Sequence, residues 1–124
     1  SKLERVSIIR KGIPYESIEG ISKRINLPIK EVLYLFGLPQ TTYNKKRREK
    51  SLLNGRDSEI VLLLTELVDF GIEVFNNEED KFQRWLKKPN YALGGYTPES
   101  LLDSTTGIQE VKNCLNRLEH GNFA

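Results

Sequence analysis

The sequence is poor in the side chains that most often carry chemistry. Its 124 residues include one cysteine, one histidine, one tryptophan and no methionine. Cys114 has no partner for a disulfide within the chain, and without a disulfide framework we expect a cytoplasmic location. No histidine and cysteine residues have the spacing of metal ligands, and no nucleophile has an evident base partner. We therefore expect no enzyme, no metal site and no cofactor.

Long apolar runs and strand patterns are missing as well. No run approaches the roughly 18 consecutive apolar residues of a membrane-spanning helix, so we expect no membrane partner. The segment 1–12 is too charged, and its apolar run too short, for a secretory signal. Apolar and polar residues nowhere alternate over the length of a strand. The sequence therefore predicts an all-α protein, either one domain or two small helical units packed together.

The charges that are present are unevenly distributed. Residues 1–56 hold 13 Lys and Arg against 5 Asp and Glu, which gives a net charge of +8. Residues 57–124 hold 6 against 12, which gives −6 and leaves the overall charge at +2. A basic front half suits a polyanion, and an acidic back half suits a basic protein surface. We therefore expect one domain over residues 1–56 and a second over residues 57–124.

Helical periodicity divides the front half into four short helices. We expect them over residues 2–11, 16–25, 28–36 and 40–50, with a tight turn at Gly37-Leu38-Pro39. The positions predicted to face inward in the second and third helices are Ile18, Ile21, Ile25, Val32, Leu33 and Phe36. A helix, a short turn containing glycine and then a polar, basic helix form the arrangement of a helix-turn-helix motif.

The segment 40–50 has the composition of a DNA-recognition helix. Tyr43 is spaced to pack back onto the third helix, which leaves polar side chains facing outward. Gln and Asn can bind adenine through two hydrogen bonds, Arg and Lys can bind guanine, and a basic run can engage phosphates. A solvated helix face is the alternative for this run. The residues expected to contact operator DNA are Gln40, Thr41, Asn44, Lys45, Lys46 and Arg48.

One position in this segment departs from the usual motif. Lys46 stands where many helix-turn-helix proteins have an aliphatic residue. The recognition helix is therefore expected either to be short or to be anchored further along the chain by Leu52 and Leu53.

A strongly apolar helix is predicted from a cap at Asp57 or Ser58 to Phe75. Of the 16 residues from Ile60 to Phe75, 11 are apolar. A helix that is apolar on more than one side must be covered on more than one side. We expect it to be the central core helix, a subunit interface or both. Because a helix-turn-helix protein usually binds a two-fold operator as a pair, we expect a homodimer.

The stretch from Trp85 to Gly121 is predicted to connect two helices through a compact turn region. Pro89 ends the first of them, Gly94 and Gly95 supply a turn, and Thr97-Pro98 opens a short helix. Thr106 is expected to cap the last helix. The inner face of that helix is predicted to consist of Ile108, Val111, Leu115 and Leu118.

Many residues of this stretch fit one known pattern. They are Trp85-Leu86, Pro89-Asn90, Leu93-Gly94-Gly95, Pro98, Leu101-Leu102, Thr105, Gly107, Val111, Leu115, Arg117 and Gly121. The pattern resembles the toxin-binding domain of the Xre/MbcA/ParS antitoxins, and the basic front half is similar to the Xre-type helix-turn-helix of the same family. The resemblance implies an antitoxin that covers the active site of a RES-domain, NAD-consuming toxin and represses its own operator.

On this resemblance, the polar positions of the last helix and an aromatic residue of the tail are expected to meet the toxin. These residues are Lys112, Asn113, Asn116, Arg117, His120 and Phe123. A stand-alone helix-turn-helix transcription regulator without a toxin partner is the alternative, and a small nucleotide-processing enzyme is a third hypothesis. The pattern over residues 85–121 favours the first over the second, and the lack of catalytic groups argues against the third.

Overall fold

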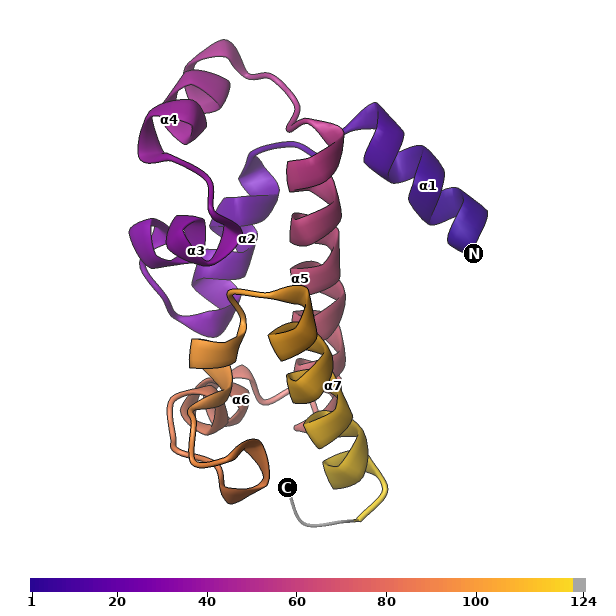
Figure 1. Ribbon diagram of the computed structural model, residues 1–124, viewed down its shortest axis with the longest axis vertical. Helices are drawn as coiled ribbons and strands as arrows, with labels where there is room; N and C mark the ends of the chain where they lie inside the picture. Colours follow the sequence, from indigo (N-terminus) through magenta and orange to yellow (C-terminus); the bar gives the residue numbers. More distant parts are fainter. Residues whose placement is uncertain (122–124) are drawn as a thin grey trace.

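The computed structural model describes residues 1–121, which form helices joined by short loops (Figure 1). The front half contains α1 (Lys2–Lys11), α2 (Glu16–Ile25), α3 (Ile29–Phe36) and α4 (Gln40–Glu49). The remainder contains α5 (Gly55–Val74), α6 (Glu79–Leu86), the 3₁₀ helices η1 (Tyr91–Leu93) and η2 (Pro98–Leu101), and α7 (Thr105–Glu119). No β-strand forms within the described residues. The prediction of an all-α protein with a helix-turn-helix unit in front is confirmed.

Helix α5 is the axis around which the other helices are arranged. α2 and α7 pack along it, α1 leans against it, and α6 lies near its C-terminal end (Figure 1). The buried side chains of α5 belong to both predicted apolar faces, and Val61, Leu64, Val68 and Ile72 are among them. The prediction of a central core helix is therefore confirmed. Its apolar faces are largely covered by the chain itself, so they do not by themselves require a second copy.

The structure corrects the predicted beginnings of two helices. α5 begins at Gly55, and the Asn54 side chain caps it by accepting a hydrogen bond from the Asp57 amide at 2.8 Å. α7 begins at Thr105, and the Ser104 hydroxyl caps it by accepting from the Gly107 amide at 2.9 Å. The predictions of Asp57 or Ser58 and of Thr106 as caps were wrong. Several neighbouring polar residues have cap chemistry, and only the one whose oxygen reaches the free amide three residues on acts as cap.

Ser58 instead joins the front of the chain to the central helix. Its buried hydroxyl accepts a hydrogen bond from the Ile13 amide at 2.9 Å and lies 3.3 Å from the Leu53 carbonyl oxygen, to which it donates. The Leu53 amide in turn donates to the Ile13 carbonyl at 2.8 Å. A buried hydroxyl is tolerated when it is fully hydrogen-bonded. These contacts fix where the segment after α4 meets the start of α2.

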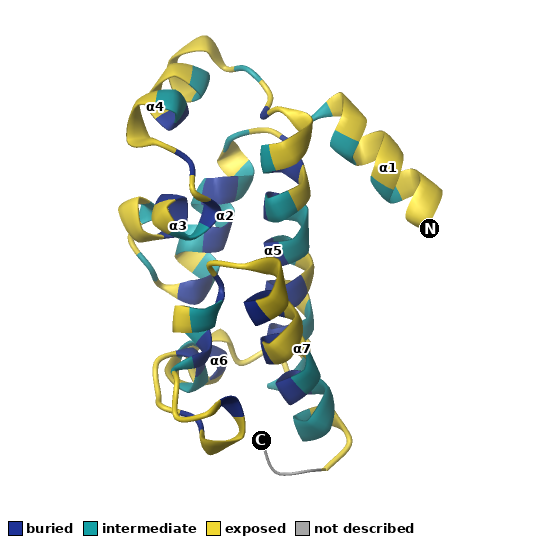
Figure 2. Ribbon diagram, viewed as in Figure 1, coloured by how far each residue is buried: buried dark blue, intermediate teal, exposed yellow. Residues whose placement is uncertain are grey.

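The core forms one continuous cluster along both halves of α5 (Figure 2). The predicted inward positions of α2 and α3 are all buried, as are Ile108, Val111 and Leu115 of α7, while Leu118 is half-buried. Cys114 is buried as well. Trp85 is half-buried, with its ring centroid 5.9 Å from that of Phe75. Trp85 therefore packs against the aromatic side chains of the core.

Helix α1 projects from the body of the molecule (Figure 1). None of its residues is buried, and Leu3, Ile8 and Val6 are 82%, 46% and 39% exposed. An ion pair of 2.8 Å between Arg5 and Glu66 ties α1 to α5. This helix carries large apolar side chains that the rest of the described chain leaves uncovered.

Candidate functional site

Two candidate sites lie at opposite ends of the molecule. α4 stands at one end of α5, whereas the loop after α6 and the last turn of α7 lie at the other (Figure 1). The first end carries the residues expected to bind DNA, and the second carries those expected to bind a partner protein. A single chain of this shape can therefore offer both surfaces at the same time.

The turn between α3 and α4 has the geometry that a helix-turn-helix needs. Gly37 ends α3 with φ +68°, a left-handed conformation that glycine adopts without a steric penalty. The Leu38 amide donates to the Leu33 carbonyl at 3.0 Å, and the Leu38 side chain is buried. Pro39 then precedes the first residue of α4. This turn sets the direction in which α4 leaves the body.

Tyr43 is the residue that anchors α4. It is 1% exposed, its hydroxyl donates to the Glu19 carboxylate at 3.2 Å, and its ring meets that of Tyr15 edge-on with centroids 6.3 Å apart. Burial, followed by the negative charge of Glu19, raises the pKa of Tyr43 to about 12. The predicted burial of Tyr43 is confirmed, and its hydrogen bond and its ring contact are made to residues at the start of α2 rather than to the third helix. It is the one residue of α4 that is buried.

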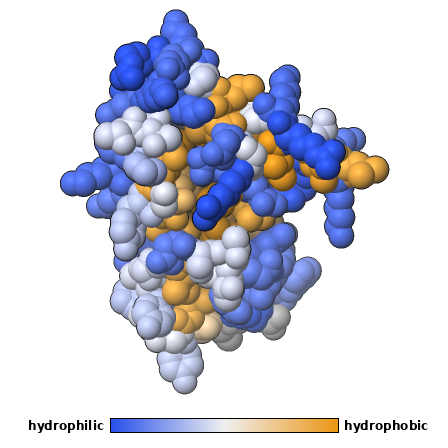
Figure 3. Space-filling model, turned by 45° about the horizontal axis from the view of Figure 1, so that its top comes forward, coloured by the Kyte–Doolittle hydropathy of each residue, from blue (hydrophilic) through white to orange (hydrophobic). Residues whose placement is uncertain are grey.

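The outer face of α4 carries most of the side chains expected to contact DNA. Gln40, Thr41, Asn44, Lys45 and Arg48 are exposed. The Gln40 side-chain amide donates to Asn44 Oδ1 at 3.1 Å, which holds the two residues as a pair at the start of the helix. The space-filling view shows hydrophilic side chains over α4 (Figure 3).

The structure shows how the recognition helix is anchored, although Lys46 stands where many helix-turn-helix proteins have an aliphatic residue. Lys46 is half-buried, so less of this side chain is available to DNA than of its neighbours. α4 ends at Glu49, and Leu53 is buried, whereas Leu52 is 41% exposed. The helix is thus both short and anchored later in the chain, by Leu53. Arg47 is exposed as well. It was not among the residues expected to contact DNA, although it belongs to the basic run of this helix.

At the other end, Asn90 organises the loop that links α6 to η2. Its backbone amide donates to the Tyr96 carbonyl at 3.0 Å, and its carbonyl accepts from Gly95 at 2.9 Å. Its side-chain oxygen accepts from the Ala92 amide at 2.9 Å, and its side-chain nitrogen lies 3.7 Å from Cys114 Sγ. Asn90 is buried, and these contacts fold the loop into one closed turn.

The residues of α7 expected to meet a partner are only partly exposed. Lys112 and His120 are exposed, whereas Asn113, Asn116 and Arg117 are half-buried. Burial raises the pKa of the Cys114 thiol, while the charge of Arg117, one turn further along α7, and a hydrogen bond from Asn90 act to lower it. Arg117 therefore belongs to the same end of the molecule as the Asn90 loop. Phe123 lies outside the described residues.

Comparisons with known proteins agree with this arrangement. The family model described as "Antitoxin Xre-like helix-turn-helix domain" matches residues 4–66, and that described as "Antitoxin Xre/MbcA/ParS C-terminal toxin-binding domain" matches residues 71–121. The chain belongs to the Xre/MbcA/ParS family of antitoxins. The resemblance noted in the sequence is thereby confirmed over both halves of the chain.

Three related proteins align with the antitoxin over most of its length. It is 28% identical to an "Antitoxin Xre" of Photorhabdus laumondii, over 93% of this chain and 78% of the relative. It is 29% identical to an "Antitoxin Xre" of Yersinia enterocolitica, over 96% of this chain and 80% of the relative. It is 30% identical to a protein of a Sphingobium species named "Prs ADP-ribosylating antitoxin", over 100% of this chain and 83% of that relative.

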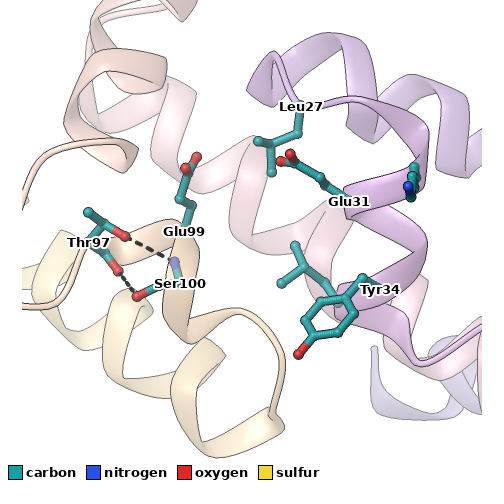
Figure 4. Close-up of a pocket in the computed structure, with 8 residues that line it drawn as sticks. Leu27, Glu31, Tyr34, Thr97, Glu99 and Ser100 are labelled. Atoms are coloured by element: carbon teal, nitrogen blue, oxygen red, sulfur yellow. Dashed lines mark hydrogen bonds between the residues drawn. The ribbon is translucent and has the colours of Figure 1, made fainter.

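Between its two ends the antitoxin has a groove of about 460 Å³ that sequence reasoning did not find. In the close-up, Leu27, Glu31 and Tyr34 face Thr97, Glu99 and Ser100 across this space (Figure 4). Lys87 connects the two halves: its ammonium donates to the Ile25 carbonyl at 3.1 Å and lies 3.4 Å from a carboxylate oxygen of Glu99, a residue that lines the groove. The two halves are thus held together by polar contacts as well as by the shared core.

We also examined residues 1–121 for groups of metal ligands and for membrane-spanning helices. Within residues 1–121 no three His, Cys, Asp or Glu side chains are grouped as ligands for a metal ion. None of the helices there is long and apolar enough to cross a membrane.

Proposed function

We propose that this antitoxin neutralises a RES-type, NAD-consuming toxin by covering its active site, and that it represses its own promoter by binding operator DNA. The observation that carries the proposal is the placement of α4 and of the Asn90 loop with α7 at opposite ends of one molecule (Figure 1). Because neither surface shields the other, the antitoxin can hold the toxin and the operator together. We assign DNA binding to residues 1–56 and toxin binding to residues 57–124.

The exposed face of α4 supports DNA binding. Gln40 and Asn44 lie in the first part of a recognition helix, where side chains usually reach base edges. Lys45 and Arg48 follow on the same helix and can neutralise phosphates. The anchored Tyr43 holds α4 in place without using any of the outward side chains. The set proposed to contact the operator is Gln40, Thr41, Asn44, Lys45, Lys46 and Arg48.

Family membership supports binding of a protein toxin, because residues 71–121 match the toxin-binding domain of the family. The name of the Sphingobium relative connects that protein to ADP-ribosylation. ADP-ribosyl transfer uses NAD as donor, so it fits the same class of NAD-consuming partner. The residues of α7 and of the tail proposed to contact the toxin are Lys112, Asn113, Asn116, Arg117, His120 and Phe123. We propose no catalytic activity and no cofactor for the antitoxin itself.

The experiment is co-expression with the protein encoded by the neighbouring reading frame. We expect that protein to arrest growth alone, growth to recover when the antitoxin is present, and the two to purify as one complex whose mass gives the stoichiometry. Depletion of cellular NAD by the neighbour alone would identify its chemistry. A neighbour with no effect on growth and no affinity for the antitoxin would favour the alternative, a stand-alone transcription regulator.

We also propose that the antitoxin is a homodimer. Two recognition helices are needed for the two halves of a pseudo-palindromic operator. Since α5 is covered by its own chain, the exposed apolar side chains of α1 are a better candidate for the contact between copies. Leu3 and Val6 lie three positions apart and thus on neighbouring parts of the helix surface. The space-filling view shows hydrophobic atoms exposed on α1 (Figure 3).

A further inference from the structure

The loop at the end opposite α4 exposes two aromatic side chains. Tyr91 is 100% exposed and Tyr96 is 62% exposed. Tyrosine has a large apolar ring and a polar hydroxyl, and two such exposed rings in one short loop are typical of a surface that binds a partner. Neither residue belonged to the main set expected from sequence to meet the toxin, for which the loop over residues 91–97 was the alternative contact. The sequence feature that marks them is one tyrosine before and one tyrosine after the pair Gly94-Gly95.

The loop that carries these tyrosines is held in one conformation. The hydrogen bond from the Asn90 amide to the Tyr96 carbonyl, 3.0 Å long, closes the loop at its two ends. Inside it, the Leu93 and Gly95 amides donate to the Asn90 carbonyl at 3.0 and 2.9 Å. Leu93 is buried and fixes the middle of the loop to the core. Binding through a loop that is already ordered avoids most of the entropic cost of ordering it.

Two glycines give the loop its shape. Gly94 and Gly95 have φ values of +68° and +86°, both in the left-handed region that other residues adopt at a cost. Space is open around Gly95, because a β-carbon built there would meet no atom within 4 Å. The chain thus reverses with its smallest side chains at the turn, and the tyrosines on either side remain accessible.

The surroundings of the loop are basic. Lys88 immediately precedes Pro89 and is exposed, and Arg117 lies near Asn90 and Cys114. Aromatic anchors surrounded by polar and charged groups have the composition of an energetic centre in a protein interface. The polar face of α7 lacks such anchors among its described residues. Its side chains fit the role of a rim better than that of a centre.

We propose that the Tyr91–Tyr96 loop is the main anchor of this antitoxin on its toxin, and that the toxin receives it in an apolar cleft with an acidic rim. This rests on the proposed toxin-binding function and assigns it to particular residues. The rings fill the cleft, the hydroxyls reach polar groups at its edge, and Lys88 and Arg117 face its carboxylates.

The test measures binding of full-length antitoxin variants to a catalytically inactive form of the neighbouring toxin by calorimetry. Truncating an anchoring aromatic residue costs at least about 30-fold in affinity, so we expect Tyr91→Ala and Tyr96→Ala each to weaken binding by that factor. Tyr91→Phe keeps the ring and is expected to stay within about fivefold of the unchanged protein. Lys88→Glu is expected to weaken binding and to make the affinity less sensitive to salt, because an attraction that salt screens has been removed.

Tyr34→Ala is the matched control, because Tyr34 is a 78% exposed tyrosine on α3, outside the loop and in the front half of the chain. It is expected to leave toxin affinity unchanged. Circular dichroism and promoter binding of each variant separate loss of contact from loss of folding. Full toxin affinity in a folded Tyr91→Ala, Tyr96→Ala double variant overturns the inference and leaves the proposed function standing. No binding by the unchanged antitoxin overturns both.

Discussion

The ring of Phe82 lies directly against Gly71, where a β-carbon would come within 2.3 Å of two ring carbons. Phe82 is fully buried, so the ring has no room to withdraw. We expect Gly71→Ala to lower the free energy of unfolding by about 1–3 kcal/mol, the usual cost of overpacking a core. Denaturant titration followed by circular dichroism measures the change.

Gly20→Ala is the control for that substitution. Gly20 also lies within a helix, α2, but a β-carbon there would meet nothing within 4 Å. Replacing glycine by alanine in an unstrained helix raises stability by about 0.5–1 kcal/mol. Opposite signs for the two substitutions support the close contact between α5 and α6. Equal, small effects at both positions would contradict it.

The second prediction concerns pH and Tyr43. Burial and Glu19 raise the pKa of Tyr43 from 10.0 to about 12, so the folded state favours the neutral phenol. The stability that Tyr43 contributes is therefore fully present below pH 10 and is lost as the pH rises from 10 towards 12. We expect the unchanged protein to lose more of its unfolding free energy over this range than Tyr43→Phe, which cannot ionise.

At neutral pH Tyr43→Phe loses one hydrogen bond to a carboxylate and is expected to cost about 1–2 kcal/mol. Chemical denaturation at pH 7, 10 and 11.5 measures both effects. Parallel pH dependence in the two proteins would show that the phenol is free to ionise, contrary to its 1% exposure.

The sequence predicted the helices and most of their buried faces because these follow from local periodicity. It could not predict which polar residue caps a helix, because Asn54, Asp57 and Ser58 all have suitable side chains and tertiary contacts decide among them. The Ser58 hydroxyl accepts a hydrogen bond from the Ile13 amide instead, and these two residues lie far apart in the sequence. The exposure of Tyr91 was unpredictable for the same reason, since an aromatic residue in a turn looks the same whether buried or free.

The third prediction concerns the operator. We expect the antitoxin to bind its own promoter with a strong salt dependence, because neutralised phosphates release counterions. Lys45→Ala and Arg48→Ala should each weaken binding and reduce the slope against log salt by about 1. Gln40→Ala and Asn44→Ala should change the preferred sequence more than the general affinity. Fluorescence anisotropy at several salt concentrations, on promoter and unrelated DNA, measures both effects.

Lys88→Ala serves as the control, because Lys88 is exposed on the opposite end of the molecule and should not alter DNA binding. Promoter binding that is insensitive to salt would exclude α4 as the DNA-binding surface. An equal loss of DNA affinity in Lys88→Ala and Lys45→Ala would exclude it as well.

The fourth prediction concerns assembly. We expect a dimer in sedimentation at roughly tens of micromolar, the range in which associations of about 7 kcal/mol are seen. Leu3→Glu combined with Val6→Glu should give a folded monomer with weaker operator binding, since charges replace the apolar contact on α1. Tyr34→Glu, at an exposed site outside α1, should remain dimeric. A dimer that survives the α1 changes would place the contact elsewhere.

The last prediction concerns the end of α7. Deleting residues 117–124 should abolish neutralisation of the toxin while promoter binding survives, because α4 lies at the opposite end of the molecule. The deletion also removes Leu118, which packs against the core, so full-length variants must separate contact from folding. Leu118→Ala reports the cost of the lost packing alone, in unfolding free energy and in toxin affinity.

Arg117→Ala removes the guanidinium without shortening the helix. An arginine can bind a carboxylate through two parallel hydrogen bonds, a geometry that lysine cannot reproduce. We therefore expect both Arg117→Ala and Arg117→Lys to weaken toxin binding, with Glu110→Ala, an exposed position on the same helix, as the unchanged control. If the truncated protein still protects cells, the Tyr91–Thr97 loop is sufficient for the contact and the end of α7 is not needed for it. If truncation removes helicity and promoter binding together, the end of α7 is structural and Arg117 loses its assigned role.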